Sequence, residues 1–522
     1  MNWVGNDRSR CEPAIQARSV PSERQGLGNS CENQSMTRPA PRRRIAIIGG
    51  GLSGLAAAHR LIELSRPDPG TVEITLFEAG PRLGGIIGTR RIGEYLVDTG
   101  ADSFLTNKPG AIGLCRRLGL EHRLVPTDAR YRGAHVLFEG RPVPVPEGFQ
   151  LISPSAIWPI VTTPLLSPWG KLRMLMECIV PAGNGDDESL AAFVRRRFGR
   201  ETLDRLVQPL VGGIYTSDPE KLSLAATMPR FLEMERKYGS LILAAFRQRN
   251  TKESESSDRS SSGARYGLFA GFAGGMEELL DALRNVVVTG CDVRTSTRVR
   301  SVSRAAGQTS GYRIGLADGT AEVFDAVIMA TTAHQAAALL TDLDPALGRE
   351  LNGIEYASSA IVVTAHKLAN VRHPLNSFGL VVPHRERRRI LATSFSSRKF
   401  PDRAPADSVL MRTFVGGAMQ PEFFDLDDDE LRRIVLAELS DIFGVRGDPE
   451  ICLVVRYPRA MPQYLVGHLD RVARIESLTA RHHGLALAGN AYRGVGVPDA
   501  ISSGESAAQA VLSTLPELSM IN

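Results

Sequence analysis

Cysteine is scarce in this sequence, and the few cysteines present are not arranged as a structural site. The 522 residues include six cysteines, none of them in a C-x-x-C pair. No set of cysteines and histidines has the spacing of a zinc site. The ten histidines show no metal spacing among themselves either. We therefore predict free thiols, a reducing compartment and no bound metal.

Long apolar stretches are also missing. No uninterrupted apolar run reaches the roughly 18 residues that a helix needs to span a bilayer. The N-terminus lacks the charged start and apolar core of a secretion signal. These absences predict a cytoplasmic protein without a membrane-spanning helix.

Strong charge of either sign is absent as well. The net charge is +5, from 62 basic and 57 acidic residues. Three basic clusters, at 42–44, 195–197 and 385–389, have the composition of solvated surface. No basic stripe alternates with aromatic residues, so we expect no nucleic-acid partner.

What the sequence does contain is the pattern of an enzyme with more than one domain. A chain of 522 residues is too long for one simple core, and two or three domains are expected. Strand patterns lie at 44–49, 72–78 and 324–331, and helical patterns at 52–65, 275–285 and 430–443. The alternation of strands and helices near the N-terminus predicts a parallel α/β sheet there.

The segment 150–180 differs from its surroundings. It is apolar, carries few charges before Lys171, and is interrupted by prolines that prevent one continuous helix. One interpretation is a buried helical subdomain. The alternative is a patch that enters a membrane surface or lines an apolar substrate channel.

A dinucleotide-binding pattern begins at the end of the first predicted strand. Gly49, Gly51 and Gly54 form G-x-G-x-x-G between that strand and a helix, which is the context the motif requires. The first glycine makes the tight turn, the second admits the pyrophosphate, and the third allows close helix packing. Phosphates then bind at the helix N-terminus. The expected cofactor contacts in this loop are Gly49, Gly50, Gly51, Leu52, Ser53 and Gly54.

The second predicted strand ends at an acidic residue. Glu78 follows Gly54 by 24 residues, where a carboxylate can accept hydrogen bonds from both ribose hydroxyls. It would repel a 2′-phosphate, so NADP is disfavoured. The glycines of "GFAGGMEELL" (271–280) follow no buried strand of the right kind, so a nicotinamide-binding domain is not supported. Oxygen or a quinone is then the expected electron acceptor.

The residues after Glu78 resemble the flavin-containing amine oxidase superfamily. The string Glu-x-x-x-Arg-x-Gly-Gly is completed by Arg82, Gly84 and Gly85, and "YLVDTGADSF" follows at 95–104. In that family the arginine and the glycine pair approach the FAD pyrophosphate and the flavin end of the cofactor. The resemblance implies non-covalent FAD, with further contacts from Ala79, Gly100, Ala101, Asp102 and Ser103.

Motifs along the rest of the chain resemble the protoporphyrinogen and coproporphyrinogen oxidases of haem synthesis. The Gly-(Ile/Val)-Tyr-x-x-Asp-x-x-x-Leu-Ser string of that family is matched by Gly213, Ile214, Tyr215, Asp218, Leu222 and Ser223. Further matches are "SFGLVVP" (377–383), "RKFPDRAPADSVLMRTFVGG" (398–417), "YPRAMPQYLVGH" (457–468) and "GNAYRGVGVPDAI" (489–501). The segment "GADSFLTNKP" (100–109) is more similar to the bacterial branch of the family.

The resemblance implies an oxidation of a porphyrinogen, which loses six hydrogens in three two-electron steps. Protoporphyrinogen IX is the first expectation, with oxygen as acceptor and hydrogen peroxide as by-product. Coproporphyrinogen III is the alternative, and another FAD amine oxidase or desaturase a lesser one. Flavin N5 takes the hydride, so no catalytic side chain is expected. A homodimer and a peripheral contact with the inner face of the cell membrane are compatible with this family.

Individual site residues follow from the same resemblance. Gly213 would form a cavity wall beside the macrocycle, Phe378 would pack on a pyrrole ring, and Arg141 would pair with a propionate. Val299 would contact the adenine through its backbone, and Tyr457 would lie near the cofactor. Two departures from the family are Thr216-Ser217 in place of Ala-Gly, and Val143 where the plant enzymes carry an arginine.

The C-terminal stretch 487–504 is expected to complete the cofactor site. "GLALAGN" is predicted to be a last strand in the sheet that begins at Ile45, and Pro498 suits the first turn of the following helix. The positive end of that helix would stabilise an anionic reduced flavin. The expected contacts there are Gly489, Asn490, Val495, Gly496 and Val497.

These patterns predict a chain of α/β and α+β class with a Rossmann-like FAD domain of the amine oxidase type, a mixed-sheet substrate domain and a helical subdomain. The predicted boundaries are 1–40 for a disordered N-terminal segment, 41–110, 262–345 and 478–516 for the FAD domain, 111–145 and 346–477 for the substrate domain, 146–246 for the helical subdomain and 247–264 for a flexible loop.

Overall fold

The computed structural model describes residues 42–66, 71–183, 185–245, 247, 268–305 and 311–515. The predicted disordered segment 1–40 lies outside the described residues, and so does the predicted loop 247–264 apart from Arg247. The chain from Arg42 onward clusters as one unit, which is the part described here.

Five parallel strands form the first sheet, in the order β12-β2-β1-β16-β22. Their bounds are β1 (Arg43–Ile48), β2 (Val72–Phe77), β12 (Asp292–Arg294), β16 (Ala326–Met329) and β22 (Leu485–Leu487). Three of these strands are the predicted ones, and β22 joins the sheet of β1 as expected. Strand β16 is shorter than the predicted strand 324–331. Phe324 belongs instead to the preceding strand, β15 (Ala321–Phe324).

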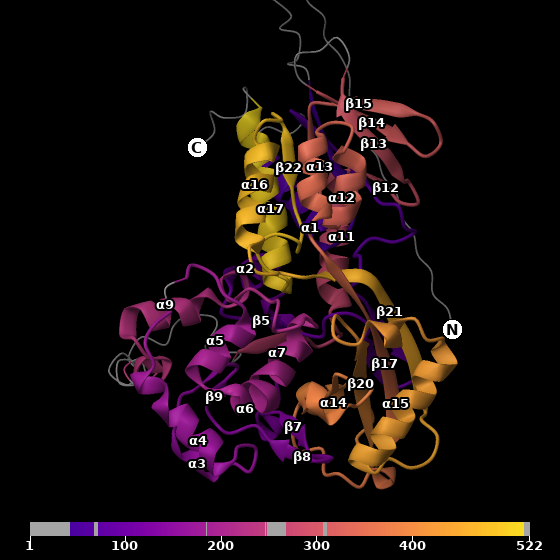
Figure 1. The fold of residues 1–522 in the computed structure, drawn as a ribbon. Helices are drawn as coiled ribbons and strands as arrows, with labels where there is room; N and C mark the ends of the chain where they lie inside the picture. Colours follow the sequence, from indigo (N-terminus) through magenta and orange to yellow (C-terminus); the bar gives the residue numbers. More distant parts are fainter. Residues whose placement is uncertain are drawn as a thin grey trace, which may run out of the picture. The chain divides into compact units, whose positions relative to one another are not determined.

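Both faces of this sheet are buried, which is why its strands are continuously apolar. In β1, Ile45 and Ile47 point into one core, while Ala46 and Ile48 point into the other. The first core contains α1 (Leu52–Ser65), α2 (Pro109–Arg117), α11 (Glu277–Gly290) and α17 (Val497–Thr514). The second contains β13 (Val299–Arg304), β14 (Tyr312–Leu316), β15, α12 (Ala333–Leu340), α13 (Pro345–Asn352) and α16 (His468–Thr479). Figure 1 shows these elements around the five-stranded sheet.

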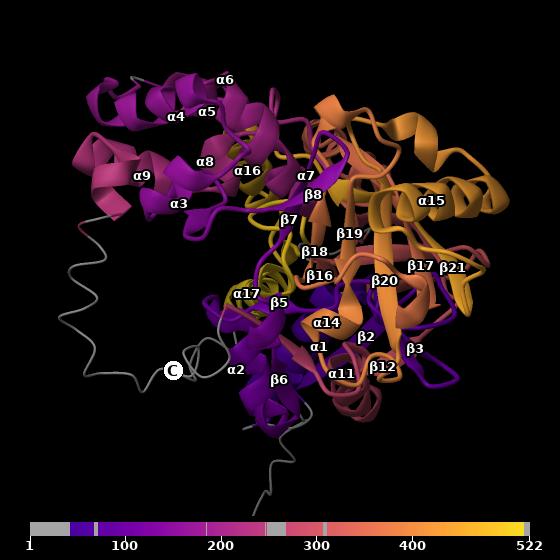
Figure 2. The ribbon, with the colours of Figure 1, turned by 90° about the horizontal axis from the view of Figure 1, so that it is seen from below.

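A seven-stranded sheet has the order β21-β17-β20-β19-β18-β7-β8 and is mixed, because β18 and β7 pair in parallel while the other neighbours are antiparallel. Its strands are β7 (His135–Phe138), β8 (Arg141–Pro144), β17 (Tyr356–Lys367), β18 (Gly379–Val381), β19 (Ala392–Phe395), β20 (Ser408–Gly416) and β21 (Ile451–Pro462). Helix α15 (Asp428–Phe443) covers one face (Figure 2). The other face packs on the hairpin of β3 (Thr89–Ile92) and β4 (Tyr95–Asp98).

Most of the segment 146–246 is helical. It contains β9 (Phe149–Gln150), β10 (Ser153–Pro154), α3 (Trp158–Thr162), α4 (Pro168–Leu175), α5 (Leu190–Arg197), α6 (Arg200–Thr202), α7 (Gln208–Tyr215), α8 (Leu224–Thr227) and α9 (Pro229–Tyr238). These elements share a core of their own. Within 150–180, Ile160 and Met174 are buried while Trp158 and Trp169 are exposed, so the segment is not wholly buried. A contact with a membrane surface or with a substrate channel stays a prediction.

The remaining elements are the antiparallel strands β5 (Phe104–Leu105), β6 (Leu124–Pro126) and β11 (Phe269–Phe272), and the short helix α14 (Ser396–Lys399). Because β11 belongs to a small antiparallel sheet, the glycines that follow it do not form a second dinucleotide loop. None of the described helices has the length and apolarity needed to cross a bilayer. The predicted fold class is thus confirmed, while the domain boundaries stay a prediction.

Candidate functional site

The first glycine loop joins β1 to α1. Gly49 donates its N–H to the Phe77 carbonyl at 2.8 Å and has a φ of +108°, which favours glycine. A Cβ on Gly54 would collide with the Gly49 carbonyl, so helix and loop touch directly. Around Gly51, in contrast, a Cβ would meet nothing within 4 Å. The loop therefore leaves open space at the position where the motif predicts a pyrophosphate.

The N-terminus of α1 faces this open space without a capping side chain. Gly51 is the N-cap residue, and no side chain accepts a hydrogen bond from the first turn. Leu52 and Ser53 are buried, and the Ser53 hydroxyl donates to the Ala500 carbonyl of α17 at 2.8 Å. The free N–H groups and the helix dipole make the site suitable for an anion.

Glu78 lies beside the same loop. Its Oε2 accepts a hydrogen bond from Gly50 N, and its Oε1 accepts one from Gly80 N, both at 2.7 Å. The carboxylate at the end of β2 thus reaches the glycine loop, as the dinucleotide pattern predicts. Ala79, the next residue, is exposed.

A second loop closes on the first. Gly84 donates its N–H to the Gly50 carbonyl at 2.7 Å, and a Cβ on Gly85 would lie 3.2 Å from the Gly51 Cα. The Arg82 guanidinium donates to the carbonyls of Gly85 and Ile87, each at 2.9 Å. Arg82 therefore fixes the shape of this loop in addition to any contact with a ligand.

Two cationic side chains hold the segment from Gly100 to Ser103. They are Lys399, in α14, and Arg412, in β20. Asp102 is buried and lies 2.8 Å from the Lys399 Nζ and 3.0 Å from the Arg412 Nη1. Burial alone would raise the pKa of Asp102, but the charges of Lys399 and Arg412 outweigh it and hold that pKa well below its usual range. Arg412 also donates to the Gly100 carbonyl.

Two smaller residues complete this segment. The Ser103 hydroxyl donates to Asp102 at 2.8 Å, and Ala101 packs against the core that contains α1. The aspartate and its two cations place one net positive charge, largely shielded from solvent, among the predicted cofactor contacts.

The C-terminal turn joins β22 to α17, and α17 packs against α1. Gly489 donates its N–H to the Ser503 hydroxyl at 3.0 Å. Gly496 is the N-cap of α17, and its N–H is 3.2 Å from the Asp499 Oδ2. The predicted strand, turn and helix are therefore present, and the helix begins at Val497, with Val495 just before the cap.

An acidic residue in the first turn of α17 modifies its expected electrostatics. Asp499 forms an ion pair with Lys108, whose Nζ lies 2.7 Å from Oδ1 and 2.8 Å from Oδ2. Without a cation, this carboxylate would oppose the positive end of the helix. Lys108 offsets the negative charge, so the helix end can still favour an anion.

Two tyrosines carry buried hydroxyls without a partner in the described part of the chain. They are Tyr457, on β21, and Tyr492, in the C-terminal turn. Burial raises the pKa of Tyr457 to about 12 and raises that of Tyr492 as well. A buried hydroxyl without a partner is costly, and a ligand group can supply the missing hydrogen bond.

Val299 begins β13 and is buried against the core that contains the end of β2. The Thr297 N–H nearby donates to the Glu78 carbonyl at 2.8 Å. The structure thus brings the predicted adenine contact close to the predicted ribose contact, with only a short stretch of backbone between them.

The three predicted substrate contacts lie on different elements. Gly213, on α7, is half-buried, and a Cβ there would lie 3.4 Å from Val381 Cγ1 in β18. Phe378 is half-buried just before β18. Arg141 is exposed at the start of β8, an edge strand of the seven-stranded sheet. The structure brings Gly213 and Phe378 to the same strand, and it places Arg141 on a surface edge.

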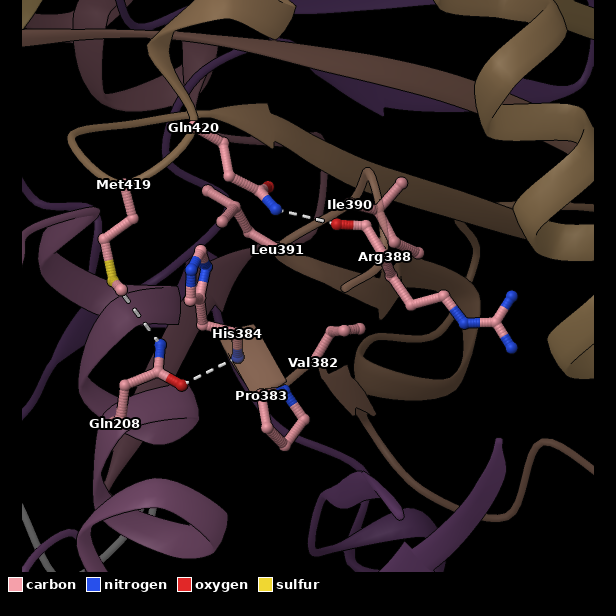
Figure 3. A pocket seen from close by; sticks show the side chains of 9 residues that line it. All are labelled: Gln208, Val382, Pro383, His384, Arg388, Ile390, Leu391, Met419 and Gln420. Atoms are coloured by element: carbon pink, nitrogen blue, oxygen red, sulfur yellow. Dashed lines mark hydrogen bonds between the residues drawn. The ribbon is translucent and has the colours of Figure 1, made fainter. Parts of the chain in front are cut away.

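A small pocket lies where α7 meets the chain after β18 (Figure 3). It is lined by Gln208, Val382, Pro383, His384, Arg388, Ile390, Leu391, Met419 and Gln420. The Gln208 Oε1 accepts from His384 N at 2.9 Å, and the Gln420 Nε2 donates to the Arg388 carbonyl at 2.7 Å. None of these residues is among the predicted cofactor or substrate contacts.

The residues present fit a bound FAD. The open space at Gly51, the uncapped end of α1 and the carboxylate of Glu78 suit its pyrophosphate and ribose. The second helix end, that of α17, suits the anionic flavin edge, and the unpartnered tyrosine hydroxyls offer further hydrogen bonds.

Several neighbours of the site were missed in the sequence. Lys108, Lys399 and Arg412 act through ion pairs with partners about 300 or more residues away, which no local pattern reveals. Tyr464 and His468 stood inside the quoted motif "YPRAMPQYLVGH" but had no role assigned. For these two, the signal was the motif itself.

Comparisons of the sequence with known proteins agree on one family. The model of the family described as flavin containing amine oxidoreductase matches residues 52–512. The chain is 34% identical over 476 residues to the coproporphyrinogen III oxidase of Bacillus subtilis (strain 168), which covers 91% of this chain and 99% of that protein. It is 30% identical over 501 residues to the mitochondrial protoporphyrinogen oxidase of Nicotiana tabacum, covering 91% and 96%.

A solved structure gives the same result for the fold. The crystal structure of a protein from Exiguobacterium sp. 255-15 superposes with a TM-score of 0.78 at 29% identity, and covers 90% of this chain and 99% of that one.

Proposed function

Since the chain belongs to the flavin-containing amine oxidoreductase family, and within it to the protoporphyrinogen and coproporphyrinogen oxidases, we propose that it oxidises a porphyrinogen to the porphyrin with non-covalently bound FAD. The family implies the flavin, and the names of the relatives imply the class of substrate. The observation that carries the proposal is the similarity over nine-tenths of the chain, combined with two glycine loops that meet beside the open space at Gly51.

Two substrates remain in competition. The sequence motifs led first to protoporphyrinogen IX, with coproporphyrinogen III as the alternative. The bacterial relative at 34% identity is named for coproporphyrinogen III, and the plant relative at 30% is named for protoporphyrinogen. This difference favours the tetracarboxylate, coproporphyrinogen III, as the substrate.

The side chains of this protein bind and orient rather than react. FAD, when bound, supplies a hydride acceptor and passes the electrons to oxygen. Glu78 and the first glycine loop would hold its adenosine and pyrophosphate, and the turn 489–496 would hold its flavin end. Gly213 and Phe378 would bound the macrocycle, whose bridging carbons must lie against the flavin.

A direct test compares the two porphyrinogens on the purified protein. Under anaerobic conditions, each porphyrinogen should bleach the flavin absorption near 450 nm, and in air each turnover should yield fluorescent porphyrin. We expect a higher kcat/KM for coproporphyrinogen III. A preference for protoporphyrinogen IX would reverse the choice of substrate, and a protein that binds no FAD would refute the oxidase.

The electron acceptor is tested in the same assay. If oxygen accepts the electrons, three molecules of hydrogen peroxide form for each porphyrin, because six electrons leave in pairs. A smaller yield of peroxide, together with faster turnover when a quinone is added, would point to the quinone instead.

An amine oxidase is the competing activity within the family. Amine oxidases usually have an aromatic cage beside the flavin. Tyr457 and Tyr492 are the residues of this chain that would have to form such a cage. Reduction of the flavin by primary amines, without reduction by either porphyrinogen, would favour that activity.

We also propose that the protein contacts a membrane surface through its helical segment. Apolar side chains are exposed together over 157–179, and they are Ile157, Trp158, Val161, Trp169, Leu172, Leu175, Met176 and Ile179. We call this set the apolar patch. Exposed apolar clusters of this kind mark interaction sites, including sites for a membrane surface.

A further inference from the structure

The turn 489–496 carries most of the predicted contacts with the flavin end of FAD, and Ala491 and Tyr492 bury its middle in the second core. Three of its eight residues are glycines. Gly489 and Gly494 have φ values of +138° and +140°, so the chain there is held in a conformation that only glycine readily adopts. Because glycine leaves the backbone free to adopt other conformations, contacts from neighbouring elements help to fix the shape of the turn.

One tyrosine hydroxyl joins the two sides of the turn. The Tyr464 hydroxyl donates to the Asn490 carbonyl at 2.6 Å and accepts a hydrogen bond from Gly494 N at 2.8 Å. Tyr464 is only 1% exposed, so neither bond has water to replace it. The hydroxyl thus closes the turn across four residues.

A histidine supports that tyrosine and holds a third point of the same turn. The rings of Tyr464 and His468 stack with centroids 4.0 Å apart and an interplanar angle of 14°. The His468 Nε2 lies 3.0 Å from the Tyr492 carbonyl. Because a carbonyl only accepts, Nε2 carries the proton and donates it. Burial lowers the pKa of His468, which keeps the ring neutral.

The loop 463–468 contains both Tyr464 and His468. It also forms backbone hydrogen bonds with the segment 213–223, whose residues match the string of the porphyrinogen oxidases. Ser223 N donates to the Tyr464 carbonyl at 2.8 Å, and Val466 N donates to the Lys221 carbonyl at 3.0 Å. The loop 463–468 therefore joins the helical segment beside Gly213 to the turn 489–496.

We propose that Tyr464 and His468 are positioning residues for the flavin, which hold the turn 489–496 in the shape that binds FAD and link it to the substrate-side segment. The proposal rests on the proposed function, because it takes this turn to be the flavin contact. It adds two residues to the site and gives the motif "YPRAMPQYLVGH" a physical role.

The test is the affinity of the apoprotein for FAD, measured by quenching of flavin fluorescence. Tyr464→Phe removes both hydrogen bonds and keeps the ring stack, and should raise the Kd for FAD at least about tenfold. The matched control is Tyr312→Phe, which removes a buried hydroxyl that donates to the His483 carbonyl at 2.7 Å, away from the turn. The control should leave the Kd unchanged.

A second pair of variants covers the case in which Tyr464→Phe fails to fold. His468→Leu removes the donor to the Tyr492 carbonyl and should raise the Kd. His468→Gln replaces the ring by an amide that can still donate, and should recover part of the affinity. The visible circular dichroism of bound flavin should shift for His468→Leu, since that signal reports the surroundings of the isoalloxazine.

The outcomes separate this proposal from the proposed function. If the wild type binds FAD and Tyr464→Phe and His468→Leu bind it equally well, the positioning role is wrong while the oxidase stands. If the wild type binds no FAD, the proposed function itself fails, whatever the variants do.

Discussion

At the scale of single residues, the charge pattern around Asp102 gives a prediction about stability. Asp102→Asn would leave the buried Arg412 and the half-buried Lys399 short of their shared counter-ion. Removing one partner of a buried ion pair costs about 3 kcal/mol, because the other charge remains desolvated. We expect a clearly lower melting temperature at neutral pH.

The pH dependence of that difference follows from the lowered pKa of Asp102. A carboxyl group whose pKa is lower in the folded than in the unfolded protein adds stability above the unfolded pKa, about 3.9, and loses it as pH falls through the folded value. The gap between wild type and variant should thus be constant from pH 5 to 8, a range set by that reference value of about 3.9.

A surface ion pair serves as the control for Asp102→Asn. Asp441 lies 2.6 Å from Arg388 and is largely exposed, so Asp441→Asn should change stability by less than about 1 kcal/mol. Equal losses for the two variants would show that the buried cluster contributes nothing particular.

Two arginines compete for the carboxylates of the substrate. Arg141, suggested by the resemblance, is exposed on an edge strand. Arg230, the second residue of α9, is exposed as well, and no carboxylate partner for it is found among the described residues. Burial lowers the pKa of Arg230, and the nearby Tyr215 of the family motif acts on it in the opposite sense. An unpaired, partly desolvated guanidinium beside that motif suits an anionic group.

We therefore expect Arg230→Met to raise KM for coproporphyrinogen III several-fold with little change in kcat, the sign of lost ground-state binding. Arg141→Met should leave both constants unchanged. Steady-state kinetics on the two variants decide the matter, and the reverse pattern would restore Arg141 as the carboxylate contact.

At the scale of elements, the packing of α17 on α1 positions the end of α17. A Cβ on Gly504 would collide with the Ser53 carbonyl in α1, which cannot yield without moving a helix. Gly504→Ala should therefore push α17 away from the glycine loop. We expect a loss of about 2 kcal/mol in stability and a weaker affinity for FAD, measured by thermal unfolding and apoprotein titration.

A second helical glycine provides the control. A Cβ on Gly113, inside α2, would lie 3.5 Å from Arg117 Nη1, an ordinary contact. Gly113→Ala should be neutral or stabilise the protein by up to about 1 kcal/mol, because alanine favours helix more than glycine does. If Gly504→Ala behaves in the same way, close packing of the two helices is not what places the end of α17.

At the scale of the whole molecule, the sequence predicted the parts of the fold that have local patterns. The strand, glycine turn and helix at 44–65, and the last strand and helix near 485–514, are visible as periodicity and glycine spacing. The mixed sheet came from the resemblance to a family, since its pairs join strands as distant as β7 and β18.

The ion pairs that shape the site could not be predicted from a single sequence. Asp499 is 391 residues from Lys108, and Asp102 is 297 residues from Lys399. An isolated lysine or arginine in a sequence is most often a solvated residue, so nothing marks these as partners. The sequence also did not show which residues of 150–180 are buried and which are exposed, because prolines and short helices interrupt the apolar periodicity there.

The last prediction concerns the apolar patch at 157–179. Trp158 and Trp169, two of the three tryptophans of the chain, are 74% and 79% exposed on it. The charged side chains nearest in sequence are Lys171 and Arg173, which suit an anionic surface, while Glu177 is buried. Vesicles of phosphatidylethanolamine and phosphatidylglycerol should therefore bind the protein and shift its tryptophan emission to shorter wavelength.

Sedimentation with those vesicles tests the same surface without relying on fluorescence. The double change Trp158→Ser and Trp169→Ser should weaken binding by at least about tenfold, since each indole loses the benefit of leaving water. Val288→Ser, on α11, changes an exposed apolar residue outside the patch and should leave binding as it is. Binding that survives the double change, or an emission that does not move, would mean that the apolar patch meets something other than a lipid surface.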